Sequence, residues 1–170
     1  MKHNILLDEL RAAFLPVPIV AAGAWEQRGR FYCDAEEYGR EMDGKTWEQL
    51  DPQFFARRSD GLSFLGTTYI IAVLPLYLHL LLVLEPTSPV RWTLLPQLTK
   101  PAPTDAPAHL FEELTIRFDE LTQALTDHQS RVVAATLRQF ITAAPNEADP
   151  AQRALDRHWH AFDAIDPPRS

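Results

Sequence analysis

Apolar residues near the start of the chain repeat with the spacing of an amphipathic helix. Within residues 4–15 the stripe comprises Leu6, Leu7, Leu10, Ala13 and Phe14. Pro16 follows and prevents continuation of the helix. A charged helix is predicted over residues 34–42, where the Asp43-Gly44 turn ends it. The Asp51-Pro52 pair is typical of the start of a further, short helix.

The C-terminal third carries two more helical patterns. Thr126 and Gln129 have the spacing of a capping box, in which the threonine oxygen accepts from the Gln129 amide and the glutamine side chain reaches back. The stripe behind this box consists of Val133, Leu137, Phe140, Ile141 and Ala144. After Pro145, the Asp149-Pro150 pair supplies an N-cap and a proline for the next helix. The apolar stripe of that helix is Ala151, Leu155, Trp159 and Phe162.

The most apolar segment lies at the centre of the chain. Residues 61–84 contain no Asp, Glu, Lys or Arg, which raises the alternative of a membrane-spanning helix. Pro75 and His79 near its middle, and the lack of a second apolar span, argue against a membrane. Because proline lacks a backbone N–H and breaks or bends a helix, we expect two shorter helices that pack as a buried pair, with one kinked helix as the alternative.

Prolines dominate the following segment, residues 85–107. They occur at positions 86, 89, 96, 101, 103 and 107. This density predicts an extended connecting strap, held to the body by apolar pegs at Val90, Trp92, Leu94, Leu95 and Leu98. Neither flank has an independent core, which disfavours a hinge between two domains. Residues 1–170 are therefore predicted to form a single, mostly α-helical domain, a bundle around the buried central helix pair.

Length and cysteine content constrain the class of protein further. A chain of 170 residues buries roughly 70% of the surface that its unfolded form exposes, so it needs no metal or disulfide to fold. Its one cysteine, Cys33, cannot form an intramolecular disulfide, and no segment near Met1 resembles a secretory signal. We therefore expect a cytoplasmic protein.

The charge balance points to a basic partner. Sixteen basic and 23 acidic side chains give a formal net charge of −7, which opposes binding to nucleic acid and speeds encounter with basic proteins. One acidic patch contains Asp34, Glu36, Glu37, Glu41 and Asp43, and a second contains Asp105, Glu112, Glu113, Asp119 and Glu120. Either patch is a solvated face or a docking surface, and the candidates we select are Glu36, Glu37, Glu41 and Asp43.

Few residues in the chain suit catalysis. His158 and His160 flank Trp159 and point about 200° apart on a helix, so they cannot share a metal ion. His79 is typical of a core histidine, and Cys33 has neighbouring carboxylates and no nearby histidine to activate it. The sequence also has no Gly-rich phosphate loop and no nucleophile elbow. We expect no enzyme activity, cofactor or metal.

Three short elements occur in a recognisable order. They are Gly44-Lys45-x-Trp47, Leu62-Ser63-Phe64-Leu65 and Leu74-Pro75-x-Tyr77-Leu78. With them the chain resembles, over roughly residues 30–160, a family of uncharacterised bacterial helical proteins. It departs from that family in a more apolar stretch before Leu74 and in a longer proline strap. Such proteins are similar in size and charge to the immunity proteins encoded beside secreted bacterial toxins.

The resemblance implies a non-catalytic protein-binding domain that binds and occludes a cognate toxin. Carboxylates would steer the encounter and exposed aromatic side chains would anchor it. Two other classes stay open. A structural or oligomeric adaptor would use an exposed apolar patch on the strap, around Trp92. A small-molecule enzyme or binding protein would need a polar pocket around His79, Tyr77 and Cys33.

Overall fold

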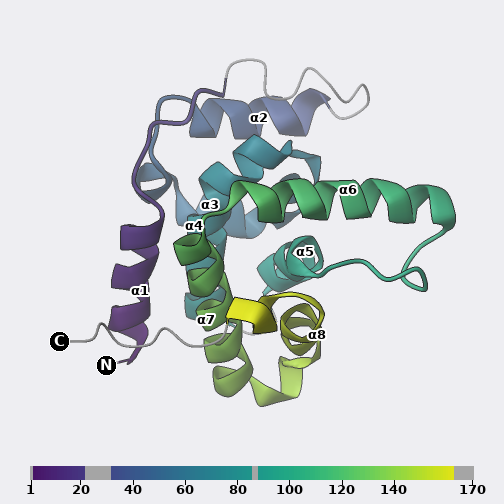
Figure 1. Ribbon diagram of the computed structural model, residues 1–170. Coiled ribbons are helices and arrows are strands. Elements are labelled where there is room, and N and C mark those ends of the chain that lie inside the picture. Colours follow the sequence, from purple (N-terminus) through teal and green to yellow (C-terminus); the bar gives the residue numbers. More distant parts are fainter. Residues whose placement is uncertain (1, 22–31, 86–87, 163–170) are drawn as a thin grey trace.

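The computed structural model describes residues 2–21, 32–85 and 88–162, with side chains for residues 6–21, 36–63, 65–85 and 88–162. Its regular secondary structure within these ranges is helical (Figure 1), which confirms the mostly α-helical class. The α-helices are α1 (Lys2–Ala13), α2 (Tyr32–Met42), α3 (Pro52–Arg57), α4 (Thr67–Val83), α5 (Pro89–Leu98), α6 (Ala108–Ala124), α7 (Asp127–Ala143) and α8 (Asp149–Arg157). Short 3-10 helices η1 (Trp47–Gln49), η2 (Ser59–Phe64), η3 (Pro145–Glu147) and η4 (Trp159–Phe162) join them.

Helix α4 forms the centre of the fold and contacts α1, α3, α5, α6 and α7. It is apolar around its whole circumference, a pattern typical of a helix enclosed by other helices, and Val73, Leu74 and Leu78 have no exposed surface. The expected pair of shorter central helices is wrong, because α4 continues through Pro75 as one helix. Proline removes one backbone hydrogen bond, and burial of the flanking side chains offsets that loss. None of the helices in the described ranges has the length and apolarity needed to cross a membrane.

The expected extended strap is also largely wrong, since its central part is helix α5. Ser88 accepts a hydrogen bond from the Val90 amide at 3.4 Å, and Pro89 occupies the first turn, where a missing N–H does no harm. Four of the expected apolar pegs are buried, namely Val90, Leu94, Leu95 and Leu98. The fifth, Trp92, lies on the outer face with 60% of its surface exposed.

Two helices begin at the capping residues expected from the sequence. Asp51 caps α3 by accepting from the Gln53 amide at 2.9 Å. At α7, the Gln129 amide donates to Thr126 at 3.2 Å, and the Thr126 amide donates to the Gln129 side chain at 2.9 Å, so the capping box is confirmed. Gly44 has φ of +72°, as the turn after α2 requires.

The last helix differs from its prediction at both ends. The N-cap of α8 is Ala148, so Asp149 is the first helical residue and makes no cap hydrogen bond with its side chain. The helix ends at Arg157, and Trp159 belongs to η4. Trp159 is nevertheless fully buried, and its indole N–H donates to the Leu98 carbonyl oxygen at 2.6 Å. This hydrogen bond ties the end of the described chain to α5.

One apolar cluster extends from Leu6 in α1 to Trp159 in η4. Trp47 joins segments distant in sequence, because its indole N–H donates to the Phe14 carbonyl oxygen at 2.8 Å. Gly61 lies so close to the Tyr38 ring that a Cβ there would come within 2.0 Å of a ring carbon. Helix α6 leaves this core at its N-terminal half and extends beyond the other helices (Figure 1).

Candidate functional site

The structure pairs the first two selected carboxylates with bases of the chain itself. Both Glu36 and Glu37 lie on α2 with exposed side chains. Glu36 forms an ion pair with Arg40 one turn further along the same helix. Glu37 forms an ion pair with Arg58, which follows α3. One of these carboxylates therefore pairs within α2, and the other pairs with the residue that follows α3.

The other two selected carboxylates also have internal partners. Glu41 accepts from the Lys45 ammonium at 2.6 Å and from the Asp51 amide at 3.4 Å. Asp43 accepts from the Ala21 amide at 2.9 Å. Three of the four candidates thus form an ion pair with a nearby base, and Asp43 accepts a hydrogen bond from a backbone N–H. The side chain of Asp34 lies outside the described residues.

The second acidic patch is divided between two places. Asp105 lies in the loop after α5, where it forms an ion pair with Arg157 of α8 and accepts from the Ala102 amide at 2.8 Å. The hydrogen bond from Arg157 holds the pKa of the Asp105 carboxyl below its usual range. Glu112, Glu113 and Glu120 lie instead on α6 and are exposed.

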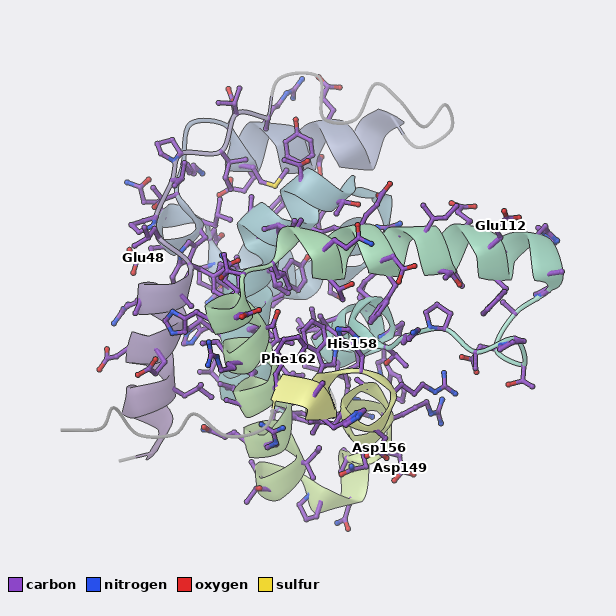
Figure 2. All side chains as sticks on the ribbon, in the orientation of Figure 1. Glu48, Glu112, Asp149, Asp156, His158 and Phe162 are labelled. Carbon is purple, nitrogen blue, oxygen red and sulfur yellow. The ribbon has the colours of Figure 1, made fainter. Side chains whose placement is uncertain are left out.

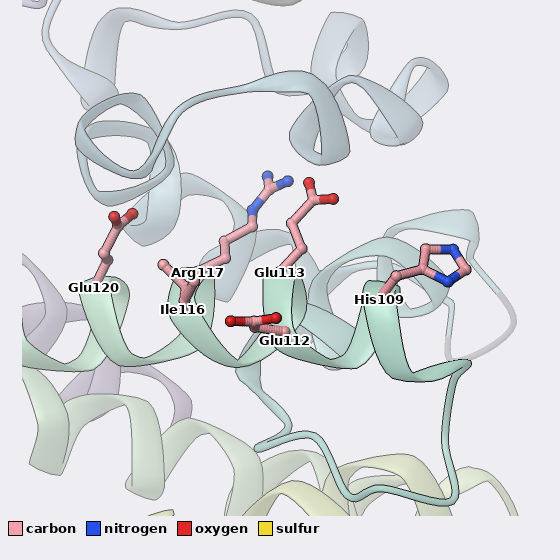
Figure 3. A pocket seen from close by; sticks show the side chains of 6 residues that line it. All are labelled: His109, Glu112, Glu113, Ile116, Arg117 and Glu120. Carbon is pink, nitrogen blue, oxygen red and sulfur yellow. The ribbon is translucent and has the colours of Figure 1, made fainter.

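The projecting part of α6 combines charge with exposed apolar surface. Ile116 is 54% exposed between the glutamates, and a shallow depression of about 310 Å³ runs along this side of the helix (Figure 3). Glu112 points to the side of α6 opposite α5 (Figure 2). We call this surface the acidic face of α6; its lining residues are His109, Glu112, Glu113, Ile116, Arg117 and Glu120, with Arg117 as the one arginine among the described lining residues.

Arg117 fixes the position of α6 on the body. Its guanidinium donates to the carbonyl oxygens of Ser63 and Leu65 at 2.9 Å and of Leu62 at 3.2 Å. These carbonyls lie at the end of η2, where backbone acceptors have no partner within the helix. Thr67, at the start of α4, adds a hydrogen bond to Glu120 at 2.9 Å. These contacts hold α6 to the body at Arg117 and Glu120, at one end of the acidic face.

A second concave surface lies on the other side of α6, between α5, α6 and α8. This groove has a volume of about 430 Å³, and we call it the arginine groove. Among the described residues, its lining includes Arg91, Arg117, Arg153 and Arg157, and Asp105 is the one carboxylate. Apolar surface comes from Trp92, Leu114 and Phe118 and from prolines. A cationic groove is unexpected in a chain of net charge −7.

The arginines of the groove are held to different extents. Arg91 is 6% exposed, forms an ion pair with Glu147, and places its guanidinium 4.2 Å from the centre of the Trp92 ring. Its buried Nε has no hydrogen-bond partner. Arg153 is exposed and has no ion-pair partner within the described ranges. The sequence alone does not reveal this groove, because its lining residues are spread between positions 91 and 157 and meet only in the folded chain.

A third groove, of about 550 Å³, lies beside α1 and α4, and none of its described lining residues is charged. It is bordered by the segment between α1 and α2, where Leu15, Val17 and Val20 are 72%, 67% and 77% exposed. Contiguous exposed apolar surface of this kind marks interaction sites. The chain therefore exposes apolar side chains in two places, at Trp92 on α5 and at Leu15, Val17 and Val20 after α1.

His158 packs among aromatic rings beside the arginine groove. Its ring meets those of Phe118 and Trp159 edge-on, with centroids at 5.0 and 4.8 Å. Partial burial, and then the nearby Lys100, lower the pKa of this imidazole, and Asp119 opposes them. No cluster of three or more metal-ligating side chains occurs among the residues the structure describes.

Of the three residues named for a small-molecule site, the structure describes the side chains of Tyr77 and His79. Tyr77 is fully buried in α4, where burial raises the pKa of its phenol, and its ring packs edge-on against Phe55. His79 is partly buried on the same helix. None of the three grooves above is lined by Tyr77 or His79. The side chain of Cys33 lies outside the described residues.

Comparisons with protein-family models, with curated proteins and with solved structures give no match for this chain.

Proposed function

We propose that the chain is a non-catalytic binding protein that docks a basic protein partner on the acidic face of α6. The observation that carries this proposal is Ile116, an exposed apolar side chain surrounded by glutamates on a projecting, anchored helix. An apolar centre with a charged rim is the usual anatomy of a protein interface. The carboxylates steer a basic partner toward the face and Ile116 provides contact area.

The narrower form of the proposal is an immunity protein that occludes a toxin in the cytoplasm. Its support is the resemblance in sequence elements, the size, and the net charge of −7. In this form of the proposal the docking surface is on α6, and not on α2 as expected from the sequence. The carboxylates Glu36, Glu37, Glu41 and Asp43 serve mainly the internal contacts described above.

The test is co-expression with the product of the adjacent open reading frame, followed by co-purification of the full chain. We expect a complex at micromolar concentration that Glu112→Lys with Ile116→Asp abolishes. The matched control is Glu36→Lys, a charge reversal of equal size on α2, which leaves the complex intact. Absence of a complex with the unchanged chain contradicts the immunity form. Loss of the complex in the control, with the α6 variant still binding, contradicts the placement on α6.

A second candidate is a structural or oligomeric adaptor, favoured by the exposed Leu15, Val17 and Val20 beside the uncharged groove. Here the purified chain would associate with itself through this apolar surface. Light scattering distinguishes the two functions. A dimer that Val17→Asp converts to a monomer supports the adaptor, and a strict monomer at high concentration removes it.

A further inference from the structure

The arginine groove has the composition of a recognition site for a negatively charged ligand. Among the described residues its lining carries Arg91, Arg117, Arg153 and Arg157 and the carboxylate of Asp105, and Glu147 pairs with Arg91. Guanidinium groups bind carboxylates through paired hydrogen bonds, which gives both affinity and orientation. The groove shares Arg117 with the depression on the acidic face of α6, and it attracts the opposite charge.

One of these arginines has clear capacity left for a ligand. Arg153 lies on α8 with an exposed guanidinium and no ion-pair partner within the described part of the chain. Arg91 is almost fully buried and forms an ion pair with Glu147. Its role is to support the groove, because its guanidinium stacks on the exposed Trp92 ring.

The other two arginines are already committed. Arg117 donates to three carbonyl oxygens around η2. Arg157 pairs with Asp105 and donates to the Lys100 carbonyl oxygen at 3.1 Å. Arg157 and Asp105 together carry no net charge, so these two arginines mainly shape the walls of the groove. The distinction assigns direct ligand contact to Arg153.

Trp92 adds an anchor for an apolar group. It is 60% exposed on α5, and the Arg91 guanidinium stacks over its ring, which limits the orientations the indole can adopt. Leu114 and Phe118 of α6 continue this apolar surface on the opposite wall. Tryptophan and arginine are the residue types most enriched among the residues that dominate binding energy at interfaces.

We propose that the arginine groove binds an acidic peptide segment of a partner protein, in which carboxylates flank an apolar or aromatic side chain. One carboxylate pairs with the exposed guanidinium of Arg153, the net positive charge of the lining attracts the other, and the apolar side chain packs on Trp92. The charge of the lining selects an acidic segment over a neutral one. This site is independent of the docking function assigned to α6.

The experiment uses the full chain and fluorescein-labelled synthetic hexapeptides, with binding measured by fluorescence anisotropy. In one panel two acidic residues flank Leu, Ile, Phe, Tyr or Trp, and in a matched panel glutamine replaces every acidic residue. We expect members of the acidic panel to bind about tenfold or more tightly than their glutamine counterparts, with affinity falling as salt rises. Absence of binding by every acidic peptide up to millimolar concentration overturns the proposal, as does equal binding of the glutamine panel.

Variants then locate the binding. Arg153→Glu and Trp92→Ala each weaken the acidic peptides by about tenfold, and both positions are exposed, so the fold is kept. The control Arg57→Glu reverses an exposed charge on α3, outside the groove, and leaves affinity unchanged. Equal weakening by the control shows that only overall charge matters and contradicts the proposal. A dimer in light scattering that Arg153→Glu dissolves means that a second copy fills the groove, which also contradicts it.

Discussion

Helices α4 and α6 have the same length, 17 residues, and opposite roles. Nine side chains of α4 are buried, whereas the buried side chains of α6 are Phe118 and Leu121. The sequence of α4 has no charged residue, and that of α6 has charges on more than one side. Burial of α4 supplies the hydrophobic stabilisation, and α6 is free to present charged side chains to a partner.

The comparison separates residues that maintain the fold from residues available for recognition. On α6 the two groups meet at Arg117, whose guanidinium binds the carbonyls of η2 while its neighbours Ile116 and Glu120 line the acidic face. Arg117 therefore helps to position α6, together with the buried Phe118 and Leu121 and the hydrogen bond between Thr67 and Glu120.

The largest expected effect comes from truncating α4. Leu78→Ala removes a fully buried side chain and should lower the free energy of unfolding by about 2–5 kcal/mol, because it leaves a cavity. Ile116→Ala on α6 should change it by less than about 0.5 kcal/mol. Urea unfolding followed by circular dichroism measures both. Similar losses at the two positions would show that the helices do not differ as described.

Removal of the α6 anchor should have the next largest effect. Arg117→Met keeps the aliphatic stem but loses the hydrogen bonds to the carbonyls of Ser63, Leu62 and Leu65, at an expected cost of about 1.5–3 kcal/mol. Arg153→Met, which removes an exposed arginine from α8, serves as the control and should be close to neutral. A neutral Arg117→Met variant would mean that α6 is held by other contacts.

A smaller effect is expected at the start of α7. Thr126→Ala removes the acceptor for the Gln129 amide and should destabilise the protein by about 1 kcal/mol. Thr142→Ala near the end of the same helix removes a hydroxyl that bonds only within its own helix, and should have less effect. Thermal unfolding of the two variants side by side measures the difference, and a larger loss at Thr142 would contradict it.

The smallest expected effect concerns pH. Because the folded-state pKa of His158 lies below its unfolded value of about 6.5, the unfolded state binds the proton more readily. Stability from this group is fully present above about pH 6.5 and is lost as the pH falls through the folded-state pKa. Unfolding free energies between pH 5 and 7.5 should therefore rise with pH, with a shallower rise in His158→Gln. If the unfolding free energy rises equally steeply with pH in that variant, groups other than His158 cause the pH dependence.

Local hydrogen-bonding patterns made parts of the fold predictable from sequence. The Thr126–Gln129 box and the Asp51 cap involve residues two or three positions apart, so their geometry follows from spacing alone. Helix α5 was missed because proline density outweighed the spacing of Val90, Leu94, Leu95 and Leu98, which fits a helical face. In α4, tertiary packing overrode the helix-breaking tendency of Pro75.

The candidate sites were harder to predict, for a physical reason. An acidic residue in a sequence carries no information about the distant base that neutralises it, as the pair between Glu37 and Arg58 illustrates. The arginine groove likewise depends on folding to bring Arg91 of α5 close to Arg153 of α8. The carboxylates of α6 were identified as an acidic patch, but their exposure around Ile116 required the structure.

Hydrogen exchange of the intact chain, followed by mass spectrometry, tests the contrast between α4 and α6 most directly. Peptides within residues 70–81 of α4 should exchange only through global unfolding, because their amides lie in the core. Peptides within residues 108–116 of α6 should exchange through local opening, at rates higher by roughly two orders of magnitude or more. Equal protection of the two segments, or faster exchange in α4, would contradict the account.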